Sequence, residues 1–180
     1  MSAKQNIAFR MIPWALIAVL LIPAGCGLLT MGEYRNSEKG YSISYPKKWE
    51  MQEDSAGADV IFLEPEEKSE GLYRRNVAVI SSELPSGAKK SDHYILQFNA
   101  ISAITPKLSN FRLHTNKFIT IDGVQGKQMT FSYDIEGVHL KVISRTVIKE
   151  NRGYVIMGSS ERLENFYDQY KKIAESFRFL

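Results

Sequence analysis

Residues 111–160 read FRLHTNKFITIDGVQGKQMTFSYDIEGVHLKVISRTVIKENRGYVIMGSS, and this stretch decides the fold. It consists of long alternating runs separated by the short turns Asp122-Gly123, Glu136-Gly137 and Asn151-Arg152-Gly153. Alternation of apolar and polar residues is typical of strands with one buried face, and tight glycine-containing turns join antiparallel neighbours. The stretch therefore predicts an antiparallel meander whose strands cover residues 111–121, 124–135, 138–149 and 154–160.

Two amphipathic helices are expected outside this meander. The first should follow a cap at Ser91 and end at Pro106, and the second should close the chain with Ser160 as its N-cap. Apolar residues recur at steps of three and four in both segments, as one core-facing stripe requires. The stripes are Tyr94, Ile95, Phe98, Ile101 and Ile104 in the first segment, and Leu163, Phe166, Tyr167, Tyr170, Ile173, Ala174 and Phe177 in the second.

Shorter strands are expected before the first helix, at residues 41–45, 50–52, 59–64 and 76–81, and Pro46 ends the first of them. Together with the meander and the two helices they predict an α+β fold. We expect an α/β/α sandwich in which helices flank a central antiparallel sheet of about six strands.

The beginning of the chain is typical of an exported lipoprotein. Lys4 and Arg10 precede the apolar run of residues 11–22, and the chain carries no charge between Arg10 and Glu33. A basic start, an apolar run and small residues form a secretory signal peptide. The segment Pro23-Ala24-Gly25-Cys26 resembles a lipobox, although proline stands where leucine is usual. We therefore predict a signal peptide over residues 1–25, a lipidated tether over 26–39 and a domain over 40–180.

Cys26 is the only cysteine of the chain, so it has no partner for an intramolecular disulfide. Acylation of its sulfur would attach the protein to the bilayer, since each buried CH₂ contributes about 0.8 kcal/mol. Two alternatives stay open. One is an ordinary cleaved leader that leaves a free thiol, and the other is an uncleaved transmembrane anchor over residues 11–31.

Net charge argues against nucleic acid as a partner. The sequence holds 23 basic and 20 acidic residues, and the leader accounts for Lys4 and Arg10. The remaining 21 bases and 20 acids give a nearly neutral domain. Nucleic-acid binding needs a basic surplus on one face. The expected partners are instead the lipid bilayer, through Cys26, and a protein at the membrane surface.

The segment Gly40-Tyr41-Ser42-Ile43-Ser44-Tyr45-Pro46-Lys47-Lys48-Trp49 resembles the opening of the PsbP-like domain. Later landmarks agree in order: Phe62-Leu63-Glu64-Pro65, Val77-Ala78-Val79, the Asp122-Gly123 turn and Ile173-Ala174-Glu175-Ser176-Phe177. The resemblance covers residues 40–180 and implies an α/β/α sandwich. Members of this family include extrinsic photosystem II subunits, and related lipoproteins also occur in bacteria without photosynthesis. Trp49, Tyr41 and Tyr45 are expected to pack in the core.

No catalytic or metal-binding pattern is evident, and we expect the protein not to be an enzyme. His93, His114 and His139 lack the short spacing of zinc ligands. The acids Glu64, Glu66, Glu67 and Glu70 flank a loop and suggest at most weak calcium binding, because the spacing of a dedicated calcium loop is missing. No cofactor is expected.

Three functions follow as hypotheses. The first is a membrane-anchored extracytoplasmic lipoprotein with a non-catalytic binding or assembly domain, located at the periplasm, the cell surface or the thylakoid lumen. The second is an extrinsic subunit or assembly factor of photosystem II that supports the oxygen-evolving centre. The third is a small-ligand binder or hydrolase that uses the face of the sheet.

Overall fold

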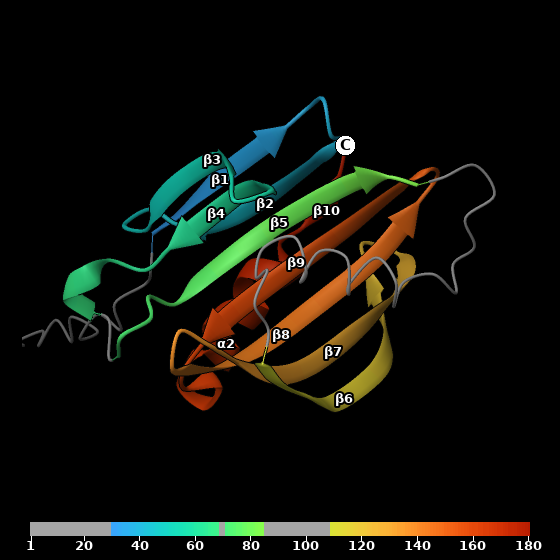
Figure 1. Ribbon diagram of the computed structural model, residues 1–180. Helices are drawn as coiled ribbons and strands as arrows, with labels where there is room; N and C mark the ends of the chain where they lie inside the picture. The colour runs from blue at the N-terminus through green and yellow to red at the C-terminus, as the bar shows by residue number, and fades with distance from the viewer. Residues whose placement is uncertain (1–29, 69–70, 85–108) are drawn as a thin grey trace, which may run out of the picture.

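The computed structural model describes residues 30–68, 71–84 and 109–180 (Figure 1). The predicted lipid site Cys26 and the predicted helix at residues 91–106 lie outside these ranges. The described elements are β1 (Met31–Asn36), β2 (Tyr41–Pro46), β3 (Glu50–Ser55), β4 (Ala58–Leu63), η1 (Glu66–Lys68), β5 (Asn76–Glu83), β6 (Ser109–Ile121), β7 (Val124–Ile135), β8 (Val138–Lys149), β9 (Arg152–Ser160), α2 (Leu163–Glu175) and β10 (Arg178–Phe179).

The strands form two antiparallel sheets. The larger sheet has seven strands in the order β3-β4-β5-β9-β8-β7-β6, and the smaller sheet has the order β1-β2-β10. The meander predicted from residues 111–160 is confirmed, because β6, β7, β8 and β9 pair in sequence. Asp122 and Gly123 have φ of 44° and 78°, and Glu136 and Gly137 have φ of 49° and 82°. Positive φ at both central residues is the type I′ turn that matches strand twist.

One face of the larger sheet is covered by both the helix and the smaller sheet (Figure 1). Helix α2 lies directly on β9, where a Cβ at Gly158 would overlap the rings of Tyr170 and Phe166. Tyr41 of β2 stacks on Phe177 with ring centroids 5.4 Å apart. The main core thus fills the space between the larger sheet on one side and α2 with β1 and β2 on the other. Burial of large apolar side chains there is the main stabilising term of the fold.

The predicted α/β/α sandwich around one sheet of about six strands is wrong. The described residues contain one α-helix, ten strands and a second sheet, so the protein is mostly β. Strand β2 was expected in the central sheet but pairs with β1 and β10. The reason is that an alternating pattern shows that a strand has a buried face, whereas it does not show which strand lies beside it.

Two local differences accompany this one. Residues 31–36, within the segment expected to be a tether, form β1, in which Tyr34 is the one buried residue. The predicted C-terminal helix is confirmed as α2, which begins at Leu163 and buries Phe166, Tyr170, Ile173 and Ala174. Ser160 is not its N-cap, because Arg162 occupies that position and the Ser160 hydroxyl accepts a hydrogen bond from the Arg162 amide at 3.0 Å. In the described residues, no helix is long and apolar enough to cross a bilayer.

Candidate binding pocket

The strands give the molecule two ends, which we call the Thr30 end and the Gly40 end. At the Thr30 end β1 begins and β2 ends, and Lys47 donates a backbone hydrogen bond to Thr30 at 2.9 Å. Leu63, Asn76 and Ser159 lie in one cross-strand row near this end of the larger sheet. At the opposite end lie the β1–β2 turn with Gly40 and the pair of Glu83 with Arg152. Eight residues of β5 separate the two ends, which is about 25 Å at 3.3 Å per residue.

A polar pocket of about 360 Å³ opens at the Gly40 end. It is assembled from the β1–β2 turn, the end of β5, the β8–β9 turn and the carboxyl terminus. Its charged and aromatic lining includes Glu38, Lys39, Glu83, Lys149, Arg152 and Tyr154.

Short contacts hold the walls of this pocket together. Arg152 Nη2 lies 3.2 Å from Glu83 Oε1, which ties the end of β5 to the start of β9. The Tyr154 hydroxyl donates to the Lys39 carbonyl at 2.9 Å, and the Leu180 amide donates to the Gly40 carbonyl at 3.0 Å. Lys149 Nζ lies 4.5 Å from the Phe179 ring centroid. The pocket is therefore fixed by elements that are far apart in the sequence.

The core contains an uncompensated polar group near this pocket. Burial raises the pKa of Asp59, and the Ser81 hydroxyl, the charge of Lys39 and the Tyr41 hydroxyl only partly offset that rise. These neighbours do not form well-aligned hydrogen bonds, because among the described residues no contact of Asp59 Oδ2 or of the Tyr41 and Ser81 hydroxyl oxygens meets the full geometry of a hydrogen bond. A buried carboxylate with unsatisfied lone pairs costs stability, so Asp59 destabilises the folded state.

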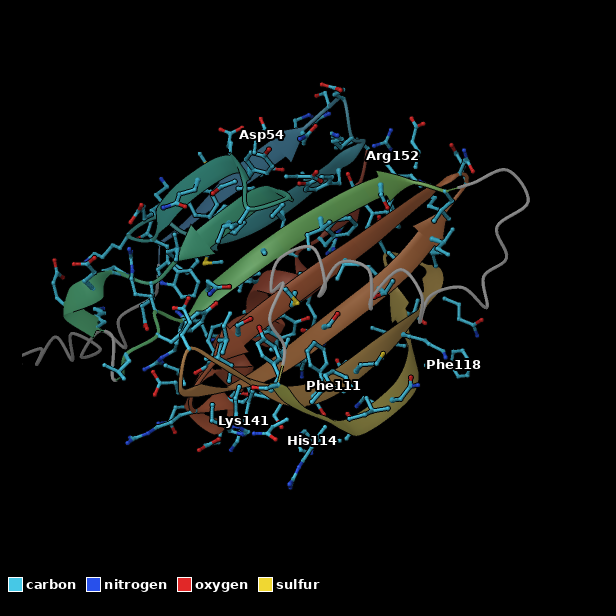
Figure 2. The ribbon with its side chains drawn as sticks, viewed as in Figure 1. Asp54, Phe111, His114, Phe118, Lys141 and Arg152 are labelled. Atoms are coloured by element: carbon cyan, nitrogen blue, oxygen red, sulfur yellow. The ribbon has the colours of Figure 1, made fainter. Side chains whose placement is uncertain are left out.

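A second, more apolar groove of about 420 Å³ lies beside the first turns of α2. Leu163 and Tyr167 form its helical wall, and Thr130, His114 and Lys141 come from β7, β6 and β8. Lys141 Nζ lies 3.4 Å from Glu164 Oε2 on the helix. Figure 2 shows His114 and Lys141 on the β6 side of the molecule, remote from Arg152 at the Gly40 end.

His114 and His139 do not form a catalytic serine–histidine–carboxylate arrangement. His114 Nε2 lies 2.9 Å from Ser132 Oγ, whereas His139 Nδ1 lies 2.6 Å from Asp134 Oδ1. The serine and the carboxylate thus contact different imidazoles. Ser132 is only 1% exposed, so its hydroxyl does not reach a substrate on the surface. His93 lies outside the described residues.

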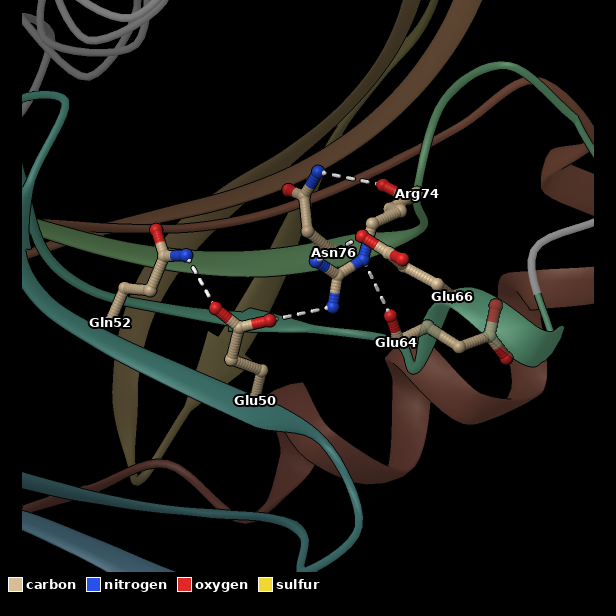
Figure 3. Close-up of polar contacts among 6 residues, drawn as sticks. All are labelled: Glu50, Gln52, Glu64, Glu66, Arg74 and Asn76. Atoms are coloured by element: carbon tan, nitrogen blue, oxygen red, sulfur yellow. Dashed lines mark hydrogen bonds and ion pairs between the residues drawn. The ribbon is translucent and has the colours of Figure 1, made fainter.

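The acids considered for calcium are largely occupied by arginines. Glu64 Oε2 lies 3.1 Å from Arg75 Nε, and Glu66 Oε1 lies 3.8 Å from Arg74 Nη1. Figure 3 shows Arg74 between Glu66, the Glu64 carbonyl and Glu50, whose Oε2 is 2.9 Å away. Glu67 is exposed on η1, and Glu70 lies outside the described residues. In the part of the chain that the structure describes, no three His, Cys, Asp or Glu residues are arranged to hold a metal ion.

Trp49, Tyr41 and Tyr45 lie where the sequence predicted. Tyr41 is fully buried, Trp49 is 6% exposed and stacks near Phe166, and Tyr45 stacks on Phe62 with centroids 4.5 Å apart. The pocket residues Lys39, Glu83, Arg152 and Tyr154 were not predicted as a site. These residues come from three segments that are distant in the sequence and share no pattern. Only the tertiary fold shows that they line the same pocket.

A model of the PsbP-like protein family matches residues 28–179. The chain belongs to the PsbP-like family. The resemblance seen in the Gly40–Trp49 segment is thereby confirmed, and the family match includes β1 as well as the core and the Gly40-end pocket.

Solved structures with this PsbP-like fold come from different bacteria. CyanoP, the PsbP protein of Synechocystis sp. PCC 6803, aligns with a TM-score of 0.62 and 19% identity over 87% of this chain and 96% of its own. LpqN of Mycobacterium tuberculosis, which is involved in cell envelope biogenesis, aligns with a TM-score of 0.58 and 16% identity over 82% of this chain and 89% of its own. PA94 of Pseudomonas aeruginosa, a putative regulator of unknown function, aligns with a TM-score of 0.54 and 16% identity over 81% of this chain and 94% of its own. No curated protein sequence matches the chain.

Proposed function

We propose that this PsbP-like protein is a lipoprotein attached to the membrane through Cys26, outside the cytoplasm. Its domain acts as a non-catalytic binding or assembly module that recruits a protein partner at the membrane surface. The polar pocket at the Gly40 end is the partner-binding site.

One observation carries this proposal: Cys26 stands only five positions before Met31, where β1 begins. Acyl chains on that sulfur would place the Thr30 end next to the bilayer and leave the Gly40-end pocket facing the aqueous compartment. The envelope role of LpqN, which shares the fold, supports a site of action in the cell envelope. The burial of Ser132 beside His114 favours binding over hydrolysis.

Metabolic labelling with palmitate tests the anchor. Wild-type protein should take up label and should accumulate as a precursor when globomycin blocks signal peptidase II. Cys26→Ala should take up none and leave the membrane fraction, whereas the neighbouring control Gly27→Ala should behave as wild type. A wild-type chain without label, or a Cys26→Ala variant that remains fully membrane-bound, would contradict lipid attachment.

The binding pocket is tested by reversing its charges. Cross-linking in solubilised membranes should give a specific product with wild type that Arg152→Glu loses. The matched control is Glu83→Arg combined with Arg152→Glu, which keeps an ion pair but exchanges its ends. If the cross-linked product is still absent with this control, the partner recognises the positive charge at residue 152 in the pocket. Recovery of the product would instead mean that the pair only holds the walls together.

The narrower function in photosystem II is favoured by one observation, the fold shared with CyanoP. A fold does not by itself assign a function, and LpqN and PA94 have the same fold. The photosynthetic role therefore requires that the protein co-purify with thylakoid complexes. A source genome without reaction-centre genes would eliminate it.

A further inference from the structure

The turn between β2 and β3 lies at the point where the chain enters the domain. Thr30 accepts the backbone hydrogen bond of Lys47 at 2.9 Å, and Met31 pairs with Pro46 across the two strands. The stem of Lys47 lies over Gly32, since a Cβ at that glycine would be 3.3 Å from Lys47 Cγ. Lys47 and Lys48 are both exposed, and they are thus fixed beside the entry point.

The connection from the proposed anchor to this turn is short. Five steps separate Cys26 from Met31, and a fully extended chain covers at most about 3.6 Å per residue. Met31 therefore lies within about 18 Å of an anchored Cys26. If residues 11–31 were instead retained as a transmembrane anchor, Met31 would lie at the membrane surface itself.

Charge around the turn favours contact with an anionic surface. Two acids near the turn are paired with arginines: Glu50 pairs with Arg74 (Figure 3), and Glu64 pairs with Arg75. Within the described residues, neither Lys47 nor Lys48 takes part in an ion pair. Lysines close to an anionic leaflet are attracted to it, and the attraction falls off within a Debye length of about 8 Å.

We infer that the Lys47-Lys48 turn is a docking surface for the phospholipid bilayer and sets the orientation of the domain on the membrane. This inference rests on the proposed membrane anchor and adds to it the face that touches lipid. In this orientation the strands run away from the bilayer, and the Gly40-end pocket lies about 25 Å farther out, as judged from the length of β5.

Tryptophan fluorescence of the full chain tests the orientation. The sequence has two tryptophans, Trp14 in the leader and Trp49 beside the two lysines. In a Trp14→Phe background, Trp49 is the only probe. Its emission in membranes should be quenched by phosphatidylcholine spin-labelled at the head group. The control carries Trp14→Phe, Trp49→Phe and Asn151→Trp, which moves the probe to the Gly40 end and should abolish quenching.

Charge reversal tests the chemistry of the contact. Lys47→Glu with Lys48→Glu leaves the Thr30 backbone bond in place, because that bond uses no side-chain atom. In vesicles that contain phosphatidylglycerol, the ratio of docked to undocked protein should fall by at least about five-fold per lysine, because each change removes an attraction and adds a repulsion. The matched control Lys171→Glu with Lys172→Glu, on the exposed side of α2, should leave the ratio unchanged.

The outcomes separate this inference from the proposed function. Membrane-bound protein with equal quenching at residues 49 and 151 would overturn the orientation and leave the anchor intact. An unchanged ratio after reversal of Lys47 and Lys48 would likewise overturn docking by these lysines. Wild-type protein found only in the soluble fraction would overturn both proposals. Quenching confined to Trp49, with loss on charge reversal, supports the docking surface.

Discussion

Strands β9 and β6 belong to the same sheet and were both predicted from the sequence, yet they differ in how deeply they are buried. Eight of the nine residues of β9 are buried, whereas only Ile121 is buried among the thirteen of β6. Strand β9 lies at the centre of the order β3-β4-β5-β9-β8-β7-β6, and β6 is one of its edges. The burial of these two strands follows their positions in the sheet, and the continuous apolar run Tyr154–Met157 of β9 suits a strand that is buried on both faces.

The cover over one face of the sheet explains part of the difference, and Val155 and Met157 of β9 belong to a second buried cluster. Helix α2 lies on β9, and the hydroxyl of Tyr170 donates to the Ile156 carbonyl at 2.9 Å. On β6, Phe111 and Leu113 are 37% and 44% exposed, and Phe118 is 66% exposed (Figure 2). Mutations under the cover should thus be costly, and mutations on β6 should be mild.

The largest effect is expected at Gly158 of β9. Gly158→Val places a side chain where the rings of Tyr170 and Phe166 lie, so α2 must move away from the sheet. The free energy of unfolding should fall by about 3 kcal/mol or more, measured by urea denaturation. Gly137→Ala, in a turn with open space but φ of 82°, is the control and should cost about 1 to 2 kcal/mol. Equal costs at both glycines would contradict the role of helix cover.

A stabilising change is expected at Asp59 of β4. Asp59→Asn removes a buried carboxylate and should raise the free energy of unfolding at pH 7 by about 1 to 2 kcal/mol. Because burial raises the pKa of Asp59, the folded state holds its proton more tightly than the unfolded state does. The contribution of Asp59 to wild-type stability is therefore lost as the pH rises through the raised pKa of Asp59 in the folded state.

The advantage of Asp59→Asn should accordingly shrink as the pH is lowered and Asp59 becomes protonated. Urea denaturation of both proteins across a pH series measures this. The exposed acid Asp54, changed to Asn, serves as the control and should give no such trend. An advantage that stays constant with pH would argue against a buried, charged Asp59.

A smaller loss is expected at the hydrogen bond between α2 and β9. Tyr170→Phe removes the donor to the Ile156 carbonyl and should lower the free energy of unfolding by about 1 kcal/mol in thermal melts. Tyr167→Phe, at a half-buried position on the same helix, is the control and should stay within about 0.5 kcal/mol of wild type. A loss at Tyr167 as large as that at Tyr170 would mean that the hydrogen bond from Tyr170 to the Ile156 carbonyl does not account for the effect.

The smallest effect is expected at the edge. Phe118→Ser removes a ring that is 66% exposed and whose centroid lies 5.4 Å from Lys127 Nζ. The free energy of unfolding should change by about 0.5 kcal/mol or less. A loss of several kcal/mol would show that β6 is covered in solution, and the comparison with β9 would then fail.

Much of the secondary structure followed from local pattern. The tight hairpin turns at residues 122–123 and 136–137, the four meander strands and the stripe of α2 were all predicted, because each depends on residues within one turn, one strand or one helix. The architecture was predicted wrongly. Strand β1 shows only Tyr34 to the core, and β10 has two residues, so neither has a detectable pattern of its own.

The candidate site was less accessible to sequence reasoning. Arg152 and Glu83 are 69 residues apart, and Tyr154 and Lys39 are 115 apart. Their side chains gain a common environment only when β5 and β9 pair and the β1–β2 turn closes beside them. Polar turn residues are common on any surface, so no property of a single one marks it as part of a pocket.

The amino-acid sequence by itself determined the family, the hairpins, the amphipathic helix and the position of Cys26 ahead of the domain. These depend on residue order and on periods of two and 3.6, which are local properties of the chain. Tertiary structure alone decided that β2 leaves the central sheet, that β9 is buried while β6 is not, and that Lys47 lies against the entry strand. The physical reason is that strand pairing and burial are settled by competition among all segments for one core.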